Sequence, residues 1–200
     1  MIRFFGGRVM TLANGIETQD IEVWTEGSKI VFVGKPKAEE LDGKVFEREY
    51  DLKGNLLMPS FKNAHTHSAM TFLRSYADDM PLQDWLFKQI FPMEAKLDGE
   101  KVYWLTKLAI LEYLTTGCTA AFDMYFELDD YVKACIESGF RSVLCGAVSG
   151  DKSNLERLEN NYLKYNGKDP LISFMLGFHA EYTCEKAVSY THLTLPTIRL

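Results

Sequence analysis

From Met58 onward, short apolar runs alternate with stretches of helical periodicity, and this alternation constrains the fold more than any other feature of the chain. Apolar side chains at helical spacing, followed by Gly117 where a helix C-cap glycine belongs, predict one helix. The side chains at this spacing are Trp104, Leu108, Leu111 and Thr115. Further helices are predicted at residues 129–138 and 154–165, and strands at residues 119–123, 141–145 and 171–178. Because apolar strands separated by helices form parallel sheets covered by those helices, the sequence predicts an α/β fold.

The number of strand–helix units is too small for a closed barrel. A (β/α)8 barrel needs about 250 residues. Residues 58–188 supply about half of that length, and the predicted strands number four when the apolar run at residues 56–60 is counted. The sequence therefore predicts a partial (β/α)8 TIM barrel of about four βα units.

The first 57 residues have a different pattern, in which short strands are joined by tight turns. Asn14-Gly15 and Glu26-Gly27 are turn sequences, and residues 20–24 alternate polar with apolar side chains as a half-buried strand does. Further strands are predicted at residues 8–12, 29–34, 46–52 and 54–58. Residues 1–57 are thus expected to form a small β unit that is incomplete as a sandwich.

Composition and charge exclude several classes of function. The 200 residues are 46% hydrophobic and 25% charged, as in a globular protein with an apolar core. A net charge of −6 without a cluster of Lys or Arg argues against nucleic acid or an anionic membrane as partner. No apolar run approaches the roughly 18 residues of a membrane helix. The four cysteines are scattered without a C-x-x-C pair, which indicates reduced thiols and a cytoplasmic protein.

His65-Thr66-His67 is the motif that carries the most chemistry. Side chains two residues apart in a strand point to the same side, so these imidazoles are placed to bind one metal ion at the end of the preceding apolar run. Imidazole suits zinc, iron, nickel and copper, and the pair alone does not select among them. The alternative is a histidine pair that binds no metal and is satisfied by hydrogen bonds at the surface or in the core.

Three further polar residues are candidates for the same site. Asp123 and His179 stand at the ends of predicted strands, where the active sites of parallel α/β folds collect. Asp123 has two interpretations: a carboxylate that hydrogen-bonds a neighbouring loop or a histidine of the site, or a purely structural carboxylate, which is favoured. His179 fits a site and a packing role equally. Glu94 has the setting of a carboxylate at a helix start. The aromatic side chains near it, expected in the core or a pocket wall, are Trp85, Phe87 and Phe91.

Several of these motifs together resemble a known family. Residues 58–67 (MPSFKNAHTH), with Arg74 shortly after them, are similar to the first barrel strand of the metal-dependent amidohydrolase superfamily. Residues 85–94, 119–126 and 177–182 resemble a narrower branch, the S-adenosylhomocysteine/5-methylthioadenosine deaminase and chlorohydrolase group. The resemblance covers residues 1–188.

The resemblance implies a β-sandwich, built from both ends of the chain, attached to a (β/α)8 barrel. Residues 1–57 would be the N-terminal part of the sandwich, and residues 58–188 the N-terminal half of the barrel. One divalent metal ion, zinc or iron, would be held by His65 and His67 together with a later histidine and a later aspartate. Water activated by this ion would attack the amidine carbon of an adenosine-like or related N-heterocyclic substrate, with release of ammonia.

The resemblance also implies roles for residues around the metal. A glutamate beyond the fourth strand would transfer the proton. Glu94 would bind the ribose hydroxyls, and His179 would contact the substrate. The expected partner is a small-molecule substrate, a nucleoside or N-heterocycle, and the full-length protein could form a homo-oligomer.

The chain departs from the family pattern in two places. Family members that act on S-adenosylhomocysteine carry arginines after the third strand, where this chain has Gly146; Arg157 is a loose candidate for the second arginine. The later barrel strands, with the remaining metal ligands and the catalytic glutamate, are absent from the 200 residues. Residues 189–200 resemble a translated sequencing adapter and are expected to be a non-native tail, so His192 is not expected to bind metal.

These observations leave three functions open. The first is a hydrolytic deaminase, of which the chain is an N-terminal fragment. The second is another amidohydrolase, such as a triazine-type chlorohydrolase. A two-metal hydrolase of cyclic amides is disfavoured because His179, not a lysine, stands near the end of the fourth strand, and a cytidine-deaminase zinc site because P-C-x-x-C is missing. The third is an inactive truncated remnant, which is the expectation for the fragment itself, whereas the family member it comes from is expected to be a deaminase.

Overall fold

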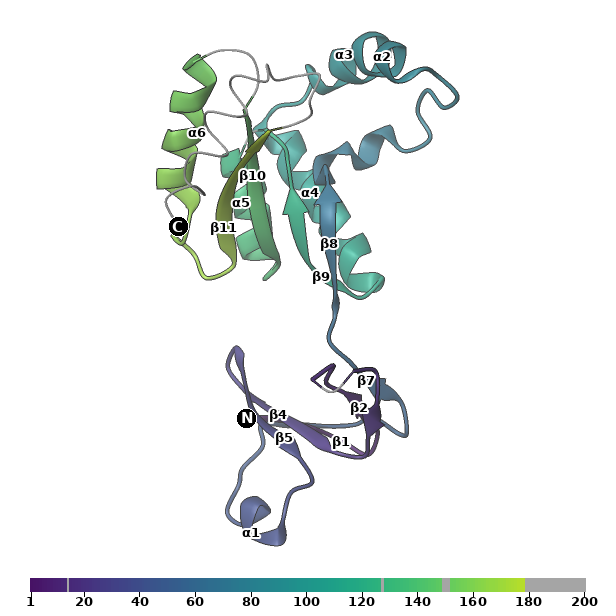
Figure 1. Ribbon diagram of the computed structural model, residues 1–200, viewed down its shortest axis with the longest axis vertical. Helices are drawn as coiled ribbons and strands as arrows, with labels where there is room; N and C mark the ends of the chain where they lie inside the picture. The colour runs from purple at the N-terminus through teal and green to yellow at the C-terminus, as the bar shows by residue number, and fades with distance from the viewer. Residues whose placement is uncertain (14, 127, 149–151, 179–200) are drawn as a thin grey trace. The chain divides into compact units, whose positions relative to one another are not determined.

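The computed structural model describes residues 1–13, 15–126, 128–148 and 152–178 (Figure 1). The chain divides into two compact units, Met1–Ser60 and Phe61–Leu200. Among the helices described, none has both the length and the apolar character needed to cross a membrane.

The N-terminal unit consists of short strands in two sheets. Its four-stranded sheet has the order β5-β4-β1-β6, and its three-stranded sheet has the order β3-β2-β7. The elements are β1 Ile2–Phe5, β2 Arg8–Met10, β3 Thr18–Gln19, β4 Glu22–Glu26, β5 Lys29–Gly34, α1 Ala38–Leu41, β6 Arg48–Asp51 and β7 Leu56–Leu57. Trp24 is buried and stacks on its cross-strand partner Phe32, with ring centroids 4.1 Å apart, which stabilises the pairing of β4 with β5.

The strand β1 lies inside the four-stranded sheet, although the sequence pattern predicts no strand there. It pairs antiparallel with β4 and parallel with β6. Four residues followed at once by Gly6-Gly7 are too short a run to show a clear strand pattern. Arg3 joins the neighbouring strands, because its guanidinium donates to Glu22 on β4 at 2.6 Å and to Glu49 on β6 at 2.9 Å.

The second unit has the α/β architecture that the sequence predicts. Its four strands form a parallel sheet in the order β11-β10-β9-β8. The helices α4, α5 and α6 lie along this sheet (Figure 1). The elements are β8 Phe61–Thr66, α4 Gly99–Thr115, β9 Cys118–Asp123, α5 Leu128–Glu137, β10 Arg141–Val148, α6 Lys152–Tyr165 and β11 Ile172–Phe178.

Local signals explain where the helix α4 begins and ends. The Asp98 side chain accepts a hydrogen bond from the Lys101 backbone N–H at 3.0 Å, which caps the N-terminus. Gly117 follows the C-terminus with φ of +83°, a conformation that glycine adopts without strain. The chain then enters β9 directly.

The helix α4 is apolar on two faces, and the buried face is not the one whose spacing predicts the helix. The buried side chains are Val102, Thr106, Ala109 and Ile110. By contrast, Trp104 is 61% exposed, Leu108 45% and Leu111 59%. The periodicity therefore predicts the helix correctly but does not indicate which face packs inside this chain.

The strand that leads to the histidine pair is β8, and the prediction of a buried strand at residues 56–60 is wrong. Leu56–Leu57 is β7, which pairs with β2 in the N-terminal unit. The strand β8 ends the order of its sheet, and Phe61 at its start is 59% exposed. The apolar pattern of a short run does not specify which sheet the run joins.

A series of short helical turns connects β8 to α4. These are the 3-10 segment η1 Ser68–Leu73, α2 Leu82–Asp84, the π-helical turn η2 Trp85–Ile90 and α3 Phe91–Glu94. Ser68, Ala69 and Leu73 are buried, so η1 is fixed by packing. Glu94 lies in the first and only turn of the four-residue helix α3, in agreement with the expectation of a carboxylate at a helix start.

Candidate metal and substrate site

His65 and His67 lie together at the carboxyl end of β8. His65 is within the strand, and His67 is the first residue after the strand ends at Thr66. Their ring centroids are 5.2 Å apart, with the ring planes at 84°. The structure thus brings the two imidazoles to one place, as the spacing of the motif predicts.

The hydrogen bond of His67 determines which ring nitrogen carries a lone pair. His67 Nδ1 is 2.7 Å from the carbonyl oxygen of Met124, which follows β9. A carbonyl oxygen only accepts, so Nδ1 carries the proton and donates. In the neutral imidazole the lone pair is then on Nε2, the tautomer that a metal ligand needs. The backbone of Met124 therefore prepares His67 for a metal.

Both histidines line a cleft of about 900 Å³ in the second unit. Trp85 and Phe91, from the connection between β8 and α4, line the same cleft, as expected for pocket-wall residues. Phe87 is 64% exposed and packs edge-on against Phe91, so its assignment to a core or pocket wall is wrong.

Glu94 supplies a carboxylate to this cleft and is half-buried. Burial raises its pKa, because a carboxylate is less stable where water is excluded. The neighbouring Tyr125 also lines the cleft, and burial followed by the charge of Glu94 raises the pKa of its phenol. In the described part of the chain, the Tyr125 hydroxyl is buried without a hydrogen bond of acceptable geometry. Glu94 thus supplies a carboxylate to the cleft, and the Tyr125 hydroxyl is buried near that carboxylate.

Asp123 holds the chain that follows the histidines. It is 1% exposed, and its two carboxylate oxygens lie 3.3 and 3.2 Å from the backbone N–H of Ser68, which donates to them. Burial raises the pKa of Asp123. The contact is a hydrogen bond to the loop that follows His67, which is one of the two interpretations of Asp123.

The donor set fits a metal ion in type but is incomplete in number. Within the residues described, no group of three or more His, Cys, Asp or Glu side chains is arranged to hold a metal ion. His65 and His67 provide two nitrogen donors of the kind that zinc and iron accept. Catalytic zinc sites use three protein ligands, so further ligands are needed. His179, and residues 189–200 with His192, lie outside the described residues.

Several contributors to the site were not found from the sequence. The Met124 oxygen belongs to the main chain, which no sequence motif identifies. Tyr113, whose hydroxyl contacts Thr66 and Ser68, comes from a helix more than 40 positions later in the chain. Tyr125 lies inside the stretch of residues 119–126 that carries the family resemblance, and this was the one available signal.

Residues 56–191, which are most of the chain, match the model of the amidohydrolase family. The chain belongs to the amidohydrolase family. A 5-methylthioadenosine/S-adenosylhomocysteine deaminase of Desulfitobacterium hafniense (strain DSM 10664 / DCB-2) is 42% identical over 168 residues, which are 82% of this chain and 39% of that protein. The protein of the same name from Pelotomaculum thermopropionicum is 40% identical over 171 residues, 83% of this chain and 39% of that protein.

Solved structures of other proteins have a fold similar to that of this amidohydrolase chain. An adenosine deaminase from Xanthomonas campestris with bound zinc superposes with a TM-score of 0.86 at 29% identity, covering 98% of this chain and 47% of that one. A guanine deaminase from C. acetobutylicum, at 17% identity and a TM-score of 0.77, covers 94% of this chain and 50% of that one and supports the fold alone. The curated relatives carry the name of the predicted branch, and the chain spans 39% of the length of the first of them.

Proposed function

We propose that the full-length protein containing this chain is a metal-dependent hydrolytic deaminase that releases ammonia from an adenosine-like substrate. The observation that carries the proposal is the histidine pair, with the His67 tautomer set by Met124, in the same cleft as Glu94. Relatives at 42% and 40% identity named 5-methylthioadenosine/S-adenosylhomocysteine deaminase support it. The proposed location is the cytoplasm, supported by the free thiols of Cys118, Cys135 and Cys145.

The finer architecture is part of the same proposal. Residues 58–188 would be the N-terminal half of a (β/α)8 barrel, with residues 1–57 as the N-terminal part of a β-sandwich and residues 189–200 as a non-native tail. Four parallel strands with helices between them support a half-barrel. The histidines stand at the carboxyl end of β8, the end of the strands where barrel enzymes place their active sites.

Five residues have proposed roles in the reaction. His65 and His67 hold one divalent ion, zinc or iron, together with ligands from the rest of the protein. Such an ion, when bound, lowers the pKa of a coordinated water toward neutrality and so supplies the nucleophile. Glu94 accepts hydrogen bonds from ribose hydroxyls, and His179 contacts the substrate. Trp85 forms an apolar wall for the ring and excludes water from it.

The side chains around Gly146 of β10 indicate which kind of substrate tail the cleft accepts. A Cβ atom at Gly146 would lie 2.3 Å from Leu158 Cδ2 and 2.7 Å from Phe174 Cζ. The place where family members that bind S-adenosylhomocysteine carry an arginine is thus occupied by apolar side chains. This favours a nucleoside with a neutral tail, although Arg157 on α6 also lines the cleft and is the alternative cation for a charged tail.

The test uses the purified full-length protein loaded with zinc or iron. Conversion of adenosine, 5-methylthioadenosine and S-adenosylhomocysteine to the inosine analogues is followed by ultraviolet absorbance, with a chlorinated triazine as the alternative substrate. We expect turnover of the adenosine compounds, fastest with the neutral tail. His67→Asn should abolish turnover and lower the metal content, whereas the surface variant Lys88→Gln should change neither.

Two results would contradict the proposal. One is a metal-loaded protein that turns over none of the adenosine compounds. The other is a complete reading frame without a later histidine, glutamate and strand-end aspartate. Turnover of the triazine alone would establish the alternative function.

A further inference from the structure

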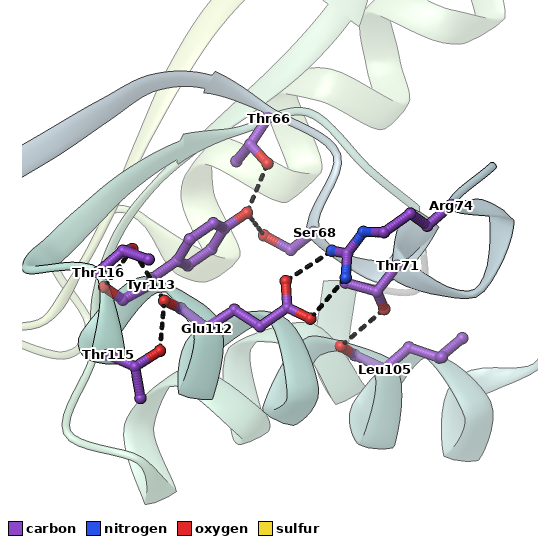
Figure 2. Close-up of polar contacts among 9 residues, drawn as sticks. All are labelled: Thr66, Ser68, Thr71, Arg74, Leu105, Glu112, Tyr113, Thr115 and Thr116. Atoms are coloured by element: carbon purple, nitrogen blue, oxygen red, sulfur yellow. Dashed lines mark hydrogen bonds and ion pairs between the residues drawn. The ribbon is translucent and has the colours of Figure 1, made fainter.

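The hydroxyl of Tyr113 lies between the two side chains that flank His67 in the sequence (Figure 2). It is 2.5 Å from Thr66 Oγ1 and 3.0 Å from Ser68 Oγ. Tyr113 belongs to α4, so a single helix side chain contacts the residues immediately before and after the histidine.

The three hydroxyls depend on one another for their hydrogen bonds. Either hydroxyl can be the donor in each contact, and Tyr113, with a single O–H, donates in at most one of the two. Loss of its oxygen would remove this partner from Thr66 and from Ser68 together. Ser68 is 2% exposed, so water has little access to replace the lost bond.

The Tyr113 ring is itself held in place. It stacks on Phe140, with centroids 5.6 Å apart and planes at 23°, and Phe140 is 1% exposed. A ring fixed against the core places its hydroxyl with little freedom.

The segment η1, which begins at Ser68, is also fastened to α4 (Figure 2). Arg74 donates two hydrogen bonds to the Glu112 carboxylate, at 3.0 and 2.6 Å. Thr71 Oγ1 donates to the Leu105 carbonyl oxygen at 3.4 Å. The chain after His67 is therefore attached to the helix at both ends of η1.

The strand β9 and Met124, which follows it, contact Thr66, His67 and Ser68 through other atoms. The Met124 N–H donates to the Thr66 carbonyl at 3.2 Å, and the Ser68 N–H donates to Asp123. The His67 ring donates to the Met124 carbonyl. These contacts fix the main chain and the ring, whereas Tyr113 fixes the side chains on either side.

We propose that Tyr113 is a positioning residue for His67, whose hydroxyl, by bridging Thr66 and Ser68, fixes the direction in which His67 presents Nε2 to the cleft. The inference rests on the proposed function, because a metal at His65 and His67 is what this positioning serves. Removing a group that orients a metal ligand weakens metal affinity by about 10–100-fold.

The experiment compares Tyr113→Phe with Tyr103→Phe in the full-length protein. Tyr103 is a matched control, because it also lies on α4 and its hydroxyl donates to the exposed Glu137 at 2.5 Å. The zinc dissociation constant is measured by competition with a chelator. The visible absorption spectrum of the cobalt(II)-substituted protein reports the geometry of the ligands.

We expect Tyr113→Phe to raise the zinc dissociation constant about 10–100-fold and to alter the cobalt spectrum, and Tyr103→Phe to leave both close to wild type. An unchanged dissociation constant in Tyr113→Phe overturns the inference. An equal loss in both variants also overturns it, because that result indicates a general effect on α4. If Tyr113→Phe does not fold, Ser68→Ala removes one of the two bonds and is judged by the same comparison.

A second measurement separates this inference from the proposed function. Amide hydrogen exchange of residues 66–68 is recorded in the metal-free protein. Tyr113→Phe should accelerate exchange of the Ser68 amide, and Tyr103→Phe should not. If the wild-type protein binds neither zinc nor iron, the proposed function fails, while exchange still decides whether Tyr113 fixes this segment.

Discussion

The Nδ1 proton of His67 is used in the bond to the Met124 carbonyl oxygen, 2.7 Å away, and this bond depends on how β8 pairs with β9. The histidine pair could be proposed from the sequence because residue type and spacing state the chemistry directly. The role of Met124 could not be predicted from the sequence, because Met124 contributes a main-chain oxygen whose position depends on tertiary structure. The same is true of Tyr113, whose role depends on packing between α4 and β8.

Glu94 allows a test at the scale of one residue. If its carboxylate binds ribose hydroxyls, Glu94→Gln removes charge-assisted hydrogen bonds that contribute about 1.5–3 kcal/mol. We expect KM for adenosine compounds to rise by about 10–100-fold, with a smaller change in kcat. The free base adenine, which has no ribose, should show no such change.

Glu100→Gln is the control for that variant, because Glu100 is exposed in the first turn of α4. It should leave both constants at wild-type values. Equal effects of Glu94→Gln on adenosine and on adenine would show that the carboxylate does not act through the ribose.

At the scale of elements, the sequence predicts the regular parts of the second unit well. The helices α4 and α5 are each followed by a glycine with positive φ, Gly117 and Gly139, and these residues mark their ends in the sequence. The short elements escape prediction, because β1 and the turns from η1 to α3 are too brief to show a period. The strand predicted at residues 54–58 of the N-terminal unit is confirmed by β7, whereas the count of residues 56–60 as the first strand of the parallel sheet is wrong, because long-range pairing determines which sheet a strand joins.

The pairing of β1 with β4 should depend on pH through Glu22. Arg3 donates two hydrogen bonds to this carboxylate, at 2.7 and 2.6 Å, and these bonds lower the pKa of Glu22. A carboxylate whose pKa is lowered by folding stabilises the fold above its unfolded pKa of about 4.3. That contribution is lost as pH falls through the folded pKa.

We therefore expect Glu22→Gln to reduce the stability of the N-terminal unit by about 1–3 kcal/mol at pH 7, and the difference from wild type to disappear in acid. Amide hydrogen exchange on β1 and β4 measures this locally. Glu49→Gln is the control, since Glu49 also binds Arg3 but is 48% exposed, and it should cost less than about 1 kcal/mol. A loss in Glu22→Gln that persists unchanged at acid pH would refute the linkage.

At the scale of the molecule, the chain covers 39% of the length of its first curated relative, so more than half of that relative has no counterpart in these 200 residues. The sheet order from β8 to β11 supports the proposed half-barrel. Trp104, Leu108 and Leu111 form an exposed apolar stripe on α4, a kind of surface that is typical of an interface. We expect the rest of the full-length protein to cover it.

Two leucines of nearly equal exposure test that expectation. Leu111 in the stripe is 59% exposed, and Leu163 on α6, whose neighbours one turn away are Glu159, Asn160 and Asn166, is 62% exposed. In the full-length protein, Leu111→Ser should lower the free energy of unfolding by about 2–5 kcal/mol, as for a buried leucine, and Leu163→Ser should stay within about 0.5 kcal/mol of wild type. Urea denaturation measures both. Small and equal effects would mean that the stripe remains exposed, because only a covered leucine loses packing when it is truncated.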